Sequence, residues 1–190
     1  DSNLQTLCMV QFIEHMSNIH RLCKEDVKFV HAETSNDKLL KYPTLTAISP
    51  KDRKEIYAKV RDRDIMKIIS THVYKQGVDF PQLDVVLCAG GGGSDIVSKQ
   101  VPGRASRKAD GKDSAIVIDF WHPWDTEDPG NTTKGNGPIL SADKQRRKAY
   151  NDLGFEQVWV NNIKELPFLN KDLVAQTVSA SRPMNNLNYL

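Results

Sequence analysis

Short apolar runs of strand length recur along this chain, and segments of helical or turn character separate most of them. Several runs are apolar at consecutive positions rather than at alternate ones, which is typical of strands covered on both faces. Strands of this kind that alternate with helices predict an α/β fold with a central, mostly parallel sheet. The predicted strands cover residues 7–12, 27–30, 65–70, 83–89 and 114–120.

The segments between these strands carry recognisable helix signals. Ser49 before Pro50 is the pattern of an N-cap followed by proline in the first helical turn, and Gly154 is placed to end a helix. Residues 13–23 repeat apolar side chains at helical spacing. We therefore predict helices at residues 13–23, 51–61 and 141–153, with a further helix beginning at residue 94.

Composition excludes several classes of protein. The 190 residues include 39% hydrophobic residues, and 26 Lys and Arg against 24 Asp and Glu give a net charge of +2. These values are those of a globular chain and not of a disordered or collagen-like one, and no apolar run is long enough to cross a membrane. The three cysteines form no C-x-x-C pair and the five histidines show no ligand spacing, so we predict no metal site and a reducing, cytoplasmic compartment.

Changes in composition suggest three parts. Residues 1–122 contain the alternating strands and helices, and residues 123–140 are rich in Pro, Gly, Asn and Asp, as in a linker. Residues 141–190 form a predicted helix-strand extension, with its strand at 155–160, followed by a polar tail. The chain has no initiator Met and reaches a predicted strand almost at once, so we expect it to be a domain of a longer protein.

One candidate site lies in the sequence Gln-Val-Pro-Gly-Arg-Ala-Ser-Arg at residues 100–107. Arg104 and Arg107 are three positions apart, so on a helix they share one face. Two guanidinium groups on one face suit phosphate oxygens, and Gly103 would allow the backbone to approach a ligand closely. A solvated basic helix face explains this spacing equally well.

A second candidate site follows the strand at residues 65–70. Ser70 and Thr71 place hydroxyl and backbone N–H groups at the carboxyl end of that strand, where open α/β sheets bind ligands. Gly77 and Asp79 then form a turn that leads toward the next strand. A plain strand exit, with Asp79 capping the turn, is the alternative.

Taken together and in this order, these segments resemble the second RecA-like domain of superfamily 2 helicases. STHVYKQGVDFPQLDVV is similar to helicase motif V with its following strand, and QVPGRASR is similar to motif VI, which is usually Q-R-x-G-R-x-x-R. The resemblance covers about residues 4–120, and its general character is that of phage-type DNA repair and recombination helicases. The first arginine of motif VI is replaced by Val101, followed by Pro102.

The resemblance implies a role for each candidate residue. ATP would bind between two RecA-like domains, and the first domain, with its phosphate loop, would hold most of the Mg²⁺ ligands. The nucleic acid along which the protein moves would be a DNA or RNA strand, with DNA favoured. The implied roles are arginine fingers for Arg104 and Arg107, orientation by Gln100, nucleotide contacts by Gly77, Asp79 and Gly103, and nucleic-acid contacts by Ser70, Thr71 and His31.

No G-x-x-x-x-G-K-[ST] phosphate loop and no acidic helicase box occurs in these 190 residues. We therefore expect an N-terminal RecA-like domain of the same protein as the partner, and no ATP hydrolysis by this chain alone. A non-catalytic RecA-like docking module and another kind of α/β nucleotide-binding domain are the alternatives. Lys144, Arg146, Arg147 and Lys148 could contact a phosphate backbone, but a solvated helix face is favoured.

Overall fold

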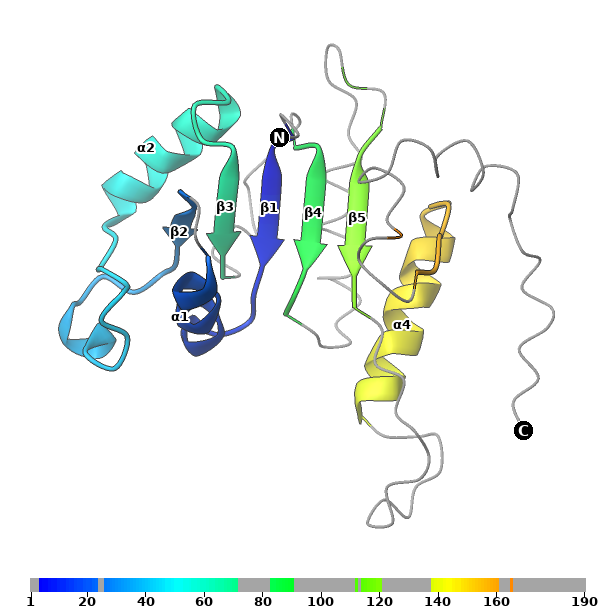
Figure 1. Ribbon diagram of the computed structural model, residues 1–190, viewed down its shortest axis with the longest axis horizontal. Helices are drawn as coiled ribbons and strands as arrows, with labels where there is room; N and C mark the ends of the chain where they lie inside the picture. The colour runs from blue at the N-terminus through cyan, green and yellow to red at the C-terminus, as the bar shows by residue number, and fades with distance from the viewer. Residues whose placement is uncertain are drawn as a thin grey trace. The chain divides into compact units, whose positions relative to one another are not determined.

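The computed structural model describes residues 4–23, 26–71, 83–90, 112, 114–120, 138–160 and 165. The chain divides into two compact units, Asp1–Leu153 and Gly154–Leu190. The elements of the first unit, in chain order, are β1 (Thr6–Met9), α1 (Ile13–Leu22), β2 (Lys28–Val30), the 3₁₀ turn η1 (Asp37–Leu39), α2 (Pro50–Arg61), β3 (Lys67–Ser70), β4 (Val85–Cys88), β5 (Ile116–Asp119) and α4 (Pro138–Asp152) (Figure 1).

The described strands form one sheet in the order β2-β3-β1-β4-β5, and every neighbouring pair is parallel. Met9 at the end of β1 lies in register with Ser70 on one side and Cys88 on the other. All strand ends therefore meet at one edge, which Figure 1 shows as the side of the arrowheads. We call this edge the carboxyl rim and define it as residues 9–12, 30–31, 70–71, 88–90 and 119–120. The predicted α/β fold with a parallel sheet is confirmed.

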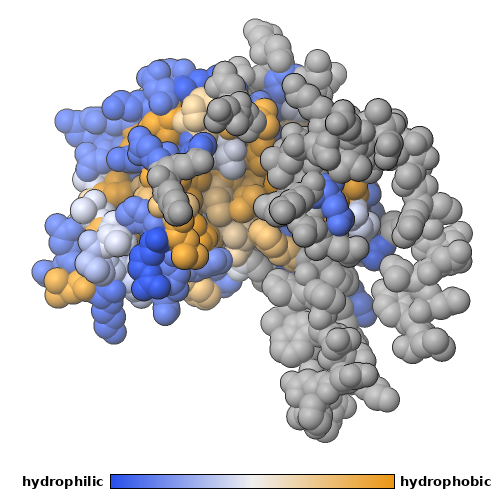
Figure 2. Space-filling model, in the orientation of Figure 1, coloured by the Kyte–Doolittle hydropathy of each residue, from blue (hydrophilic) through white to orange (hydrophobic). Residues whose placement is uncertain are grey.

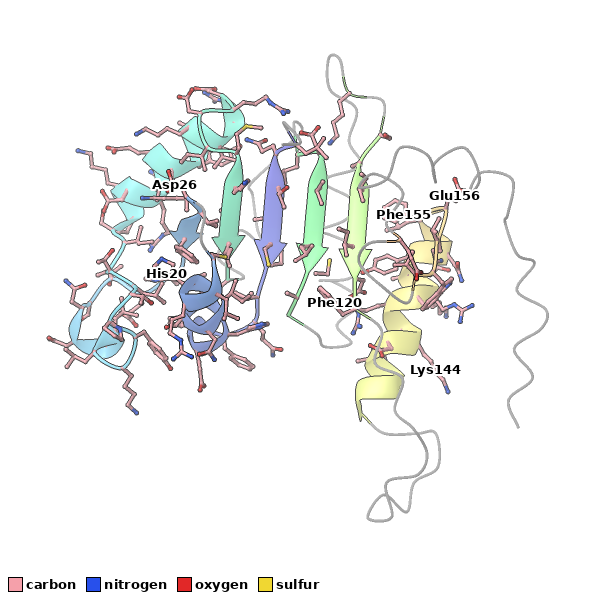
Figure 3. All side chains as sticks on the ribbon, viewed as in Figure 1. His20, Asp26, Phe120, Lys144, Phe155 and Glu156 are labelled. Carbon is pink, nitrogen blue, oxygen red and sulfur yellow. The ribbon has the colours of Figure 1, made fainter. Side chains whose placement is uncertain are left out.

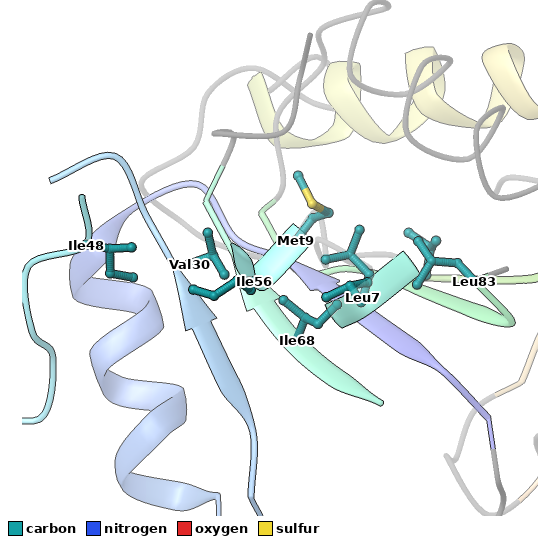
Figure 4. Close-up of a cluster of buried hydrophobic side chains, with 9 residues drawn as sticks. Leu7, Met9, Val30, Ile48, Ile56, Ile68 and Leu83 are labelled. Carbon is teal, nitrogen blue, oxygen red and sulfur yellow. The ribbon is translucent and has the colours of Figure 1, made fainter. Parts of the chain in front are cut away.

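Apolar side chains of alternating direction give the sheet two buried faces. Leu7 and Met9 of β1 belong to a cluster that includes Ile56 and Val60 of α2, shown in Figure 4. The intervening Cys8 belongs to a second cluster with Met16 of α1. Because successive strand residues point to opposite faces, α1 and α2 cover opposite sides of the sheet. The result is the three-layer arrangement expected of a RecA-like domain.

Helix α2 begins with the cap that its sequence predicts. The Ser49 hydroxyl accepts a hydrogen bond from the Asp52 backbone N–H at 3.1 Å, and the Asp52 carboxylate accepts one from the Ser49 backbone N–H at 3.0 Å. Pro50 occupies the first turn. These reciprocal bonds form a capping box and satisfy backbone donors that an uncapped helix leaves free.

Helix α4 differs slightly from its prediction. It begins at Pro138 rather than at residue 141, in keeping with the preference of proline for a first helical turn, and it ends at Asp152. Gly154 has φ of 70°, a conformation in which glycine ends helices without strain. No described helix is long and apolar enough to span a bilayer.

The strand predicted at residues 155–160 is wrong. The structure assigns no strand to this stretch, and Val158 and Trp159 are 48% and 53% exposed. The sequence Phe-Glu-Gln-Val-Trp-Val has strand-like composition, but a strand exists only where a neighbour completes its hydrogen-bond ladder. No described strand pairs with it.

Candidate nucleotide and nucleic-acid interface

The structure describes three of the predicted site residues, and all three lie at the carboxyl rim. Ser70 ends β3, Thr71 follows it, and His31 follows β2. The Thr71 N–H donates to the Val30 carbonyl at 3.1 Å, so the ends of β2 and β3 are joined at the rim. The other predicted residues lie outside the described part of the chain: Gly77, Asp79, Gln100, Gly103, Arg104 and Arg107.

The hydroxyl of Ser70 is directed to the backbone. Ser70 is fully buried, and its Oγ donates to the Thr71 carbonyl at 2.7 Å. Thr71 is 8% exposed. A buried hydroxyl of this kind contributes by fixing the backbone, because its hydrogen-bonding capacity is already used within the protein. The Ser70 carbonyl accepts from the Val10 N–H at 2.9 Å, so the backbone here is also bonded within the protein. The predicted contacts of these two residues with nucleic acid therefore remain predictions.

His31 is almost completely buried, with 1% of its surface exposed. Burial is the largest cause and lowers the pKa of its imidazole, while the charge of the Glu33 carboxylate acts in the opposite direction. Neither ring nitrogen makes a hydrogen bond in this structure. His31 is thus a buried side chain packed at the rim, and a direct nucleic-acid contact by its ring remains a prediction.

Arg53 of α2 holds the segment that leaves β2. Its Nη1 donates to the Ile48 carbonyl at 2.8 Å and to the His31 and Ala32 carbonyls at 3.3 Å each. Nη1 carries two N–H groups, so one of them is shared between two of these carbonyls. Arg53 therefore fixes the rim at the end of β2 to the beginning of α2.

A buried polar cluster joins α4 to the end of β5. The Arg146 Nε donates to the Asp119 carboxylate at 2.7 Å, and its Nη2 bonds the Phe120 carbonyl at 3.1 Å and the Asp143 carboxylate. The Tyr150 hydroxyl also donates to Asp119, at 2.8 Å. We call Asp119, Asp143, Arg146 and Tyr150 the α4 anchor. It fixes both the helix and the first residue beyond β5.

The anchor corrects one interpretation of the sequence. The basic sequence around Arg146 favours a solvated helix face, but Arg146 is 6% exposed and paired with two carboxylates. Lys144 is exposed and extends away from the sheet (Figure 3). The signals available in the sequence were the acidic end of the apolar strand at Asp119 and the i, i+3 pair of Asp143 with Arg146.

The electrostatics of the anchor favour a structural role. Burial disfavours the charge of Arg146, but its hydrogen bonds and the charges of Asp119 and Asp143 outweigh this effect, so its pKa is raised. Burial, followed by the charge of Asp119, raises the pKa of Cys88 to about 12. The thiol therefore stays protonated and unreactive at neutral pH.

Two large aromatic side chains of the rim are exposed. Phe12 follows β1 and is 62% exposed, and Phe120 follows β5 and is 47% exposed. Figure 3 shows Phe120 where β5 ends. Figure 2 shows that hydrophilic residues cover much of the described surface around β2 and α2, with apolar residues visible between them. The sequence analysis had not singled out either phenylalanine.

Comparison with known proteins identifies the class to which this fold and rim belong. The family described as "Helicase conserved C-terminal domain" matches residues 1–109. That match covers more than half of the chain, so the chain belongs to this family. The predicted resemblance to the C-terminal RecA-like domain of superfamily 2 helicases is confirmed, while its phage-type character remains a prediction.

Two proteins with similar sequences are named as ATP-dependent helicases. The chain is 31% identical over 68 residues to ATP-dependent DNA helicase MPH1 of Vanderwaltozyma polyspora, covering 36% of this chain and 7% of the relative. It is 41% identical over 59 residues to the uncharacterized ATP-dependent helicase YprA of Bacillus subtilis, covering 31% of this chain and 8% of the relative. The chain thus aligns with a small part of each relative's length.

Solved structures with a similar arrangement are more distant. The ATP-dependent Type ISP restriction-modification enzyme LlaBIII bound to DNA has a TM-score of 0.47 and 18% identity, covering 78% of this chain and 10% of that one. The C-terminal domain of the DEAD-box protein Dbp5 has a TM-score of 0.40 and 15% identity, covering 93% of this chain and 97% of that one.

Proposed function

We propose that this chain is the C-terminal motor domain of an ATP-dependent helicase or translocase that acts on nucleic acid, with DNA as the favoured track. The observation that carries the proposal is the family match over residues 1–109, together with the Q-x-x-G-R-x-x-R spacing inside that segment. The parallel sheet supports it, because ligands of open α/β sheets bind at the carboxyl ends of the strands.

In this proposal an N-terminal RecA-like domain of the same protein closes over the carboxyl rim and carries the phosphate loop and most Mg²⁺ ligands. Arg104 and Arg107 supply guanidinium groups to the γ-phosphate, and Gln100 orients the same region. Gly103, Gly77 and Asp79 line the nucleotide side. The paired guanidinium groups suit the charge that develops on phosphate oxygens during hydrolysis, where such a residue contributes about 10³–10⁵ in turnover.

Nucleic acid would contact the rim at Ser70, Thr71 and His31, mainly through the backbone that these buried residues hold in place. Phosphate contacts of this kind give position without sequence preference, which is what movement along a strand requires. Opening and closing of the two domains with ATP binding and hydrolysis would convert nucleotide affinity into movement.

The test is the change Arg104→Ala in the intact protein. We expect the turnover of nucleic-acid-stimulated ATP hydrolysis to fall about a thousandfold, with a much smaller change in nucleotide KM. The matched control is Arg21→Ala, an exposed arginine near the end of α1. Undiminished hydrolysis by the Arg104 variant would remove the finger assignment. Nucleic-acid binding by an intact protein that never hydrolyses ATP would favour a docking module instead.

A further inference from the structure

Phe12 and Phe120 stand at the carboxyl ends of two strands that flank β4. Phe12 lies three residues beyond β1 and Phe120 directly beyond β5. Since adjacent strands are about 4.8 Å apart, the two strand ends are separated by about 10 Å along the rim. Both side chains are large, apolar and about half exposed or more.

Phe12 also occupies a position at which its residue type does not help the fold. It is the N-cap of α1, and no side-chain hydrogen bond caps that helix. Ser, Thr, Asp and Asn stabilise this position by accepting a hydrogen bond from the helix N-terminus, whereas an exposed aromatic ring does not. Where a natural sequence departs from such a local rule, a functional constraint is the expected reason.

The strand between the two rings ends in small residues. Ala89 and Gly90 follow β4, and a Cβ on Gly90 would lie 3.2 Å from the Gln11 backbone nitrogen. A side chain here would be tight, because 3.2 Å is closer than nine in ten contacts of a real Cβ, and the Gln11 backbone would have to move by a few tenths of an ångström. Among the described residues of the rim, those that follow the strand between the two rings are therefore small.

We propose that Phe12 and Phe120 are stacking platforms for two bases of a single nucleic-acid strand that lies across the carboxyl rim. Stacking on isolated aromatic rings is a sequence-tolerant way to hold bases, and it suits a track that must be released and bound again. Ser70 and Thr71 are buried, whereas the two rings are exposed and can be reached by a strand. This inference rests on the proposed function and names the base contacts of the same site.

The experiment measures the affinity of the intact protein for two fluorescein-labelled strands of equal length, oligo(dT) and a fully abasic strand. We expect Phe12→Ala and Phe120→Ala each to weaken oligo(dT) binding about tenfold and to leave the abasic strand unchanged. Phe12→Tyr and Phe120→Tyr should restore the affinity, since tyrosine keeps the ring. Leu22→Ala is the matched control, because Leu22 is 79% exposed at the other end of α1.

The proposal would be overturned by unchanged oligo(dT) binding in both alanine variants, by an equal loss on both strands, or by a loss confined to one ring. An equal loss indicates an effect on phosphate contacts or on folding. A variant that instead lowers ATP hydrolysis without nucleic acid assigns the rings to contact with the other motor domain, and this also contradicts stacking. If the wild type binds oligo(dT) and hydrolyses ATP while both variants match it, stacking fails and the proposed function stands. If the wild type binds neither strand, stacking on DNA bases fails, and so does DNA as the favoured substrate.

Discussion

Two helices of this domain are attached to the sheet by different kinds of contact. Ile56 and Val60 of α2 pack into an apolar cluster with residues of β1, β2 and β3. Helix α4 is instead fixed to β5 by the α4 anchor, in which Arg146 is paired with Asp119 and Asp143. Apolar packing tolerates small changes of shape, whereas a buried charge depends on each partner being present. Single substitutions in the α4 anchor should therefore lower the free energy of unfolding more than those in the apolar contacts of α2.

The largest effect should come from Arg146→Met, which removes the cation and leaves two carboxylates without it. Breaking a buried ion pair from one side costs about 3–5 kcal/mol of the free energy of unfolding. The measurement is urea unfolding of this chain, with Lys144→Met on the same helix as an exposed control.

A double variant tests whether the loss of stability comes from unbalanced buried charge or from lost packing. Arg146→Met combined with Asp143→Leu should recover part of the loss, because it removes a buried charge of each sign. If the double variant is less stable than Arg146→Met, the anchor stabilises the domain by its hydrogen bonds and shape, and the comparison with α2 has to be revised.

A smaller effect on the free energy of unfolding should distinguish the N-terminus of α2, which has a side-chain cap, from that of α1, which has none. Ser49→Ala should lower the free energy of unfolding by about 1 kcal/mol because it removes the cap of α2, and Phe12→Ser should raise it by up to about 1 kcal/mol by providing α1 with a cap. Thermal unfolding measures both. The Phe12→Ser variant should at the same time bind oligo(dT) more weakly. A less stable Phe12→Ser protein would show that the ring contributes to packing.

The smallest expected effect is a pH dependence of the free energy of unfolding that comes from His31, the residue after β2. The pKa of folded His31 lies below the ordinary value of 6.5, so the unfolded chain binds this proton more readily. Stability is therefore full above about pH 6.5 and decreases as the pH falls toward the lowered pKa. Urea midpoints between pH 7.5 and 5 should show the decrease in the wild type and a weaker one in His31→Leu. An equal slope in both proteins would assign the pH dependence to other groups.

Much of the fold could be predicted because its signals are local. The capping pattern at Ser49 and the apolar runs placed the described strands and helices within about three residues. The observed strands are shorter than predicted, because pairing with neighbours rather than composition sets where a strand ends. The predicted strand at residues 155–160 failed for the same reason, since its composition could not provide a partner.

For the candidate site, the positions of some residues could be predicted, but their burial and pairing could not. Family-like spacing located Ser70, Thr71 and His31 at the rim, but no local pattern indicated that these residues are buried. The pairing of Arg146 with Asp119 spans 27 residues, and a surface helix face was a reasonable expectation without it. The exposure of Phe12 and Phe120 was equally hidden, because apolar residues next to strands are usually part of the core.

The order of apolar runs, helix signals and arginine spacing in the sequence alone determined the α/β class and the helicase family. These properties depend on neighbours a few residues apart, so they can be read along the chain. The tertiary structure alone decided which polar groups are buried together and which aromatic rings remain exposed at the carboxyl rim. Burial depends on segments far apart in the sequence that the parallel sheet brings to one edge.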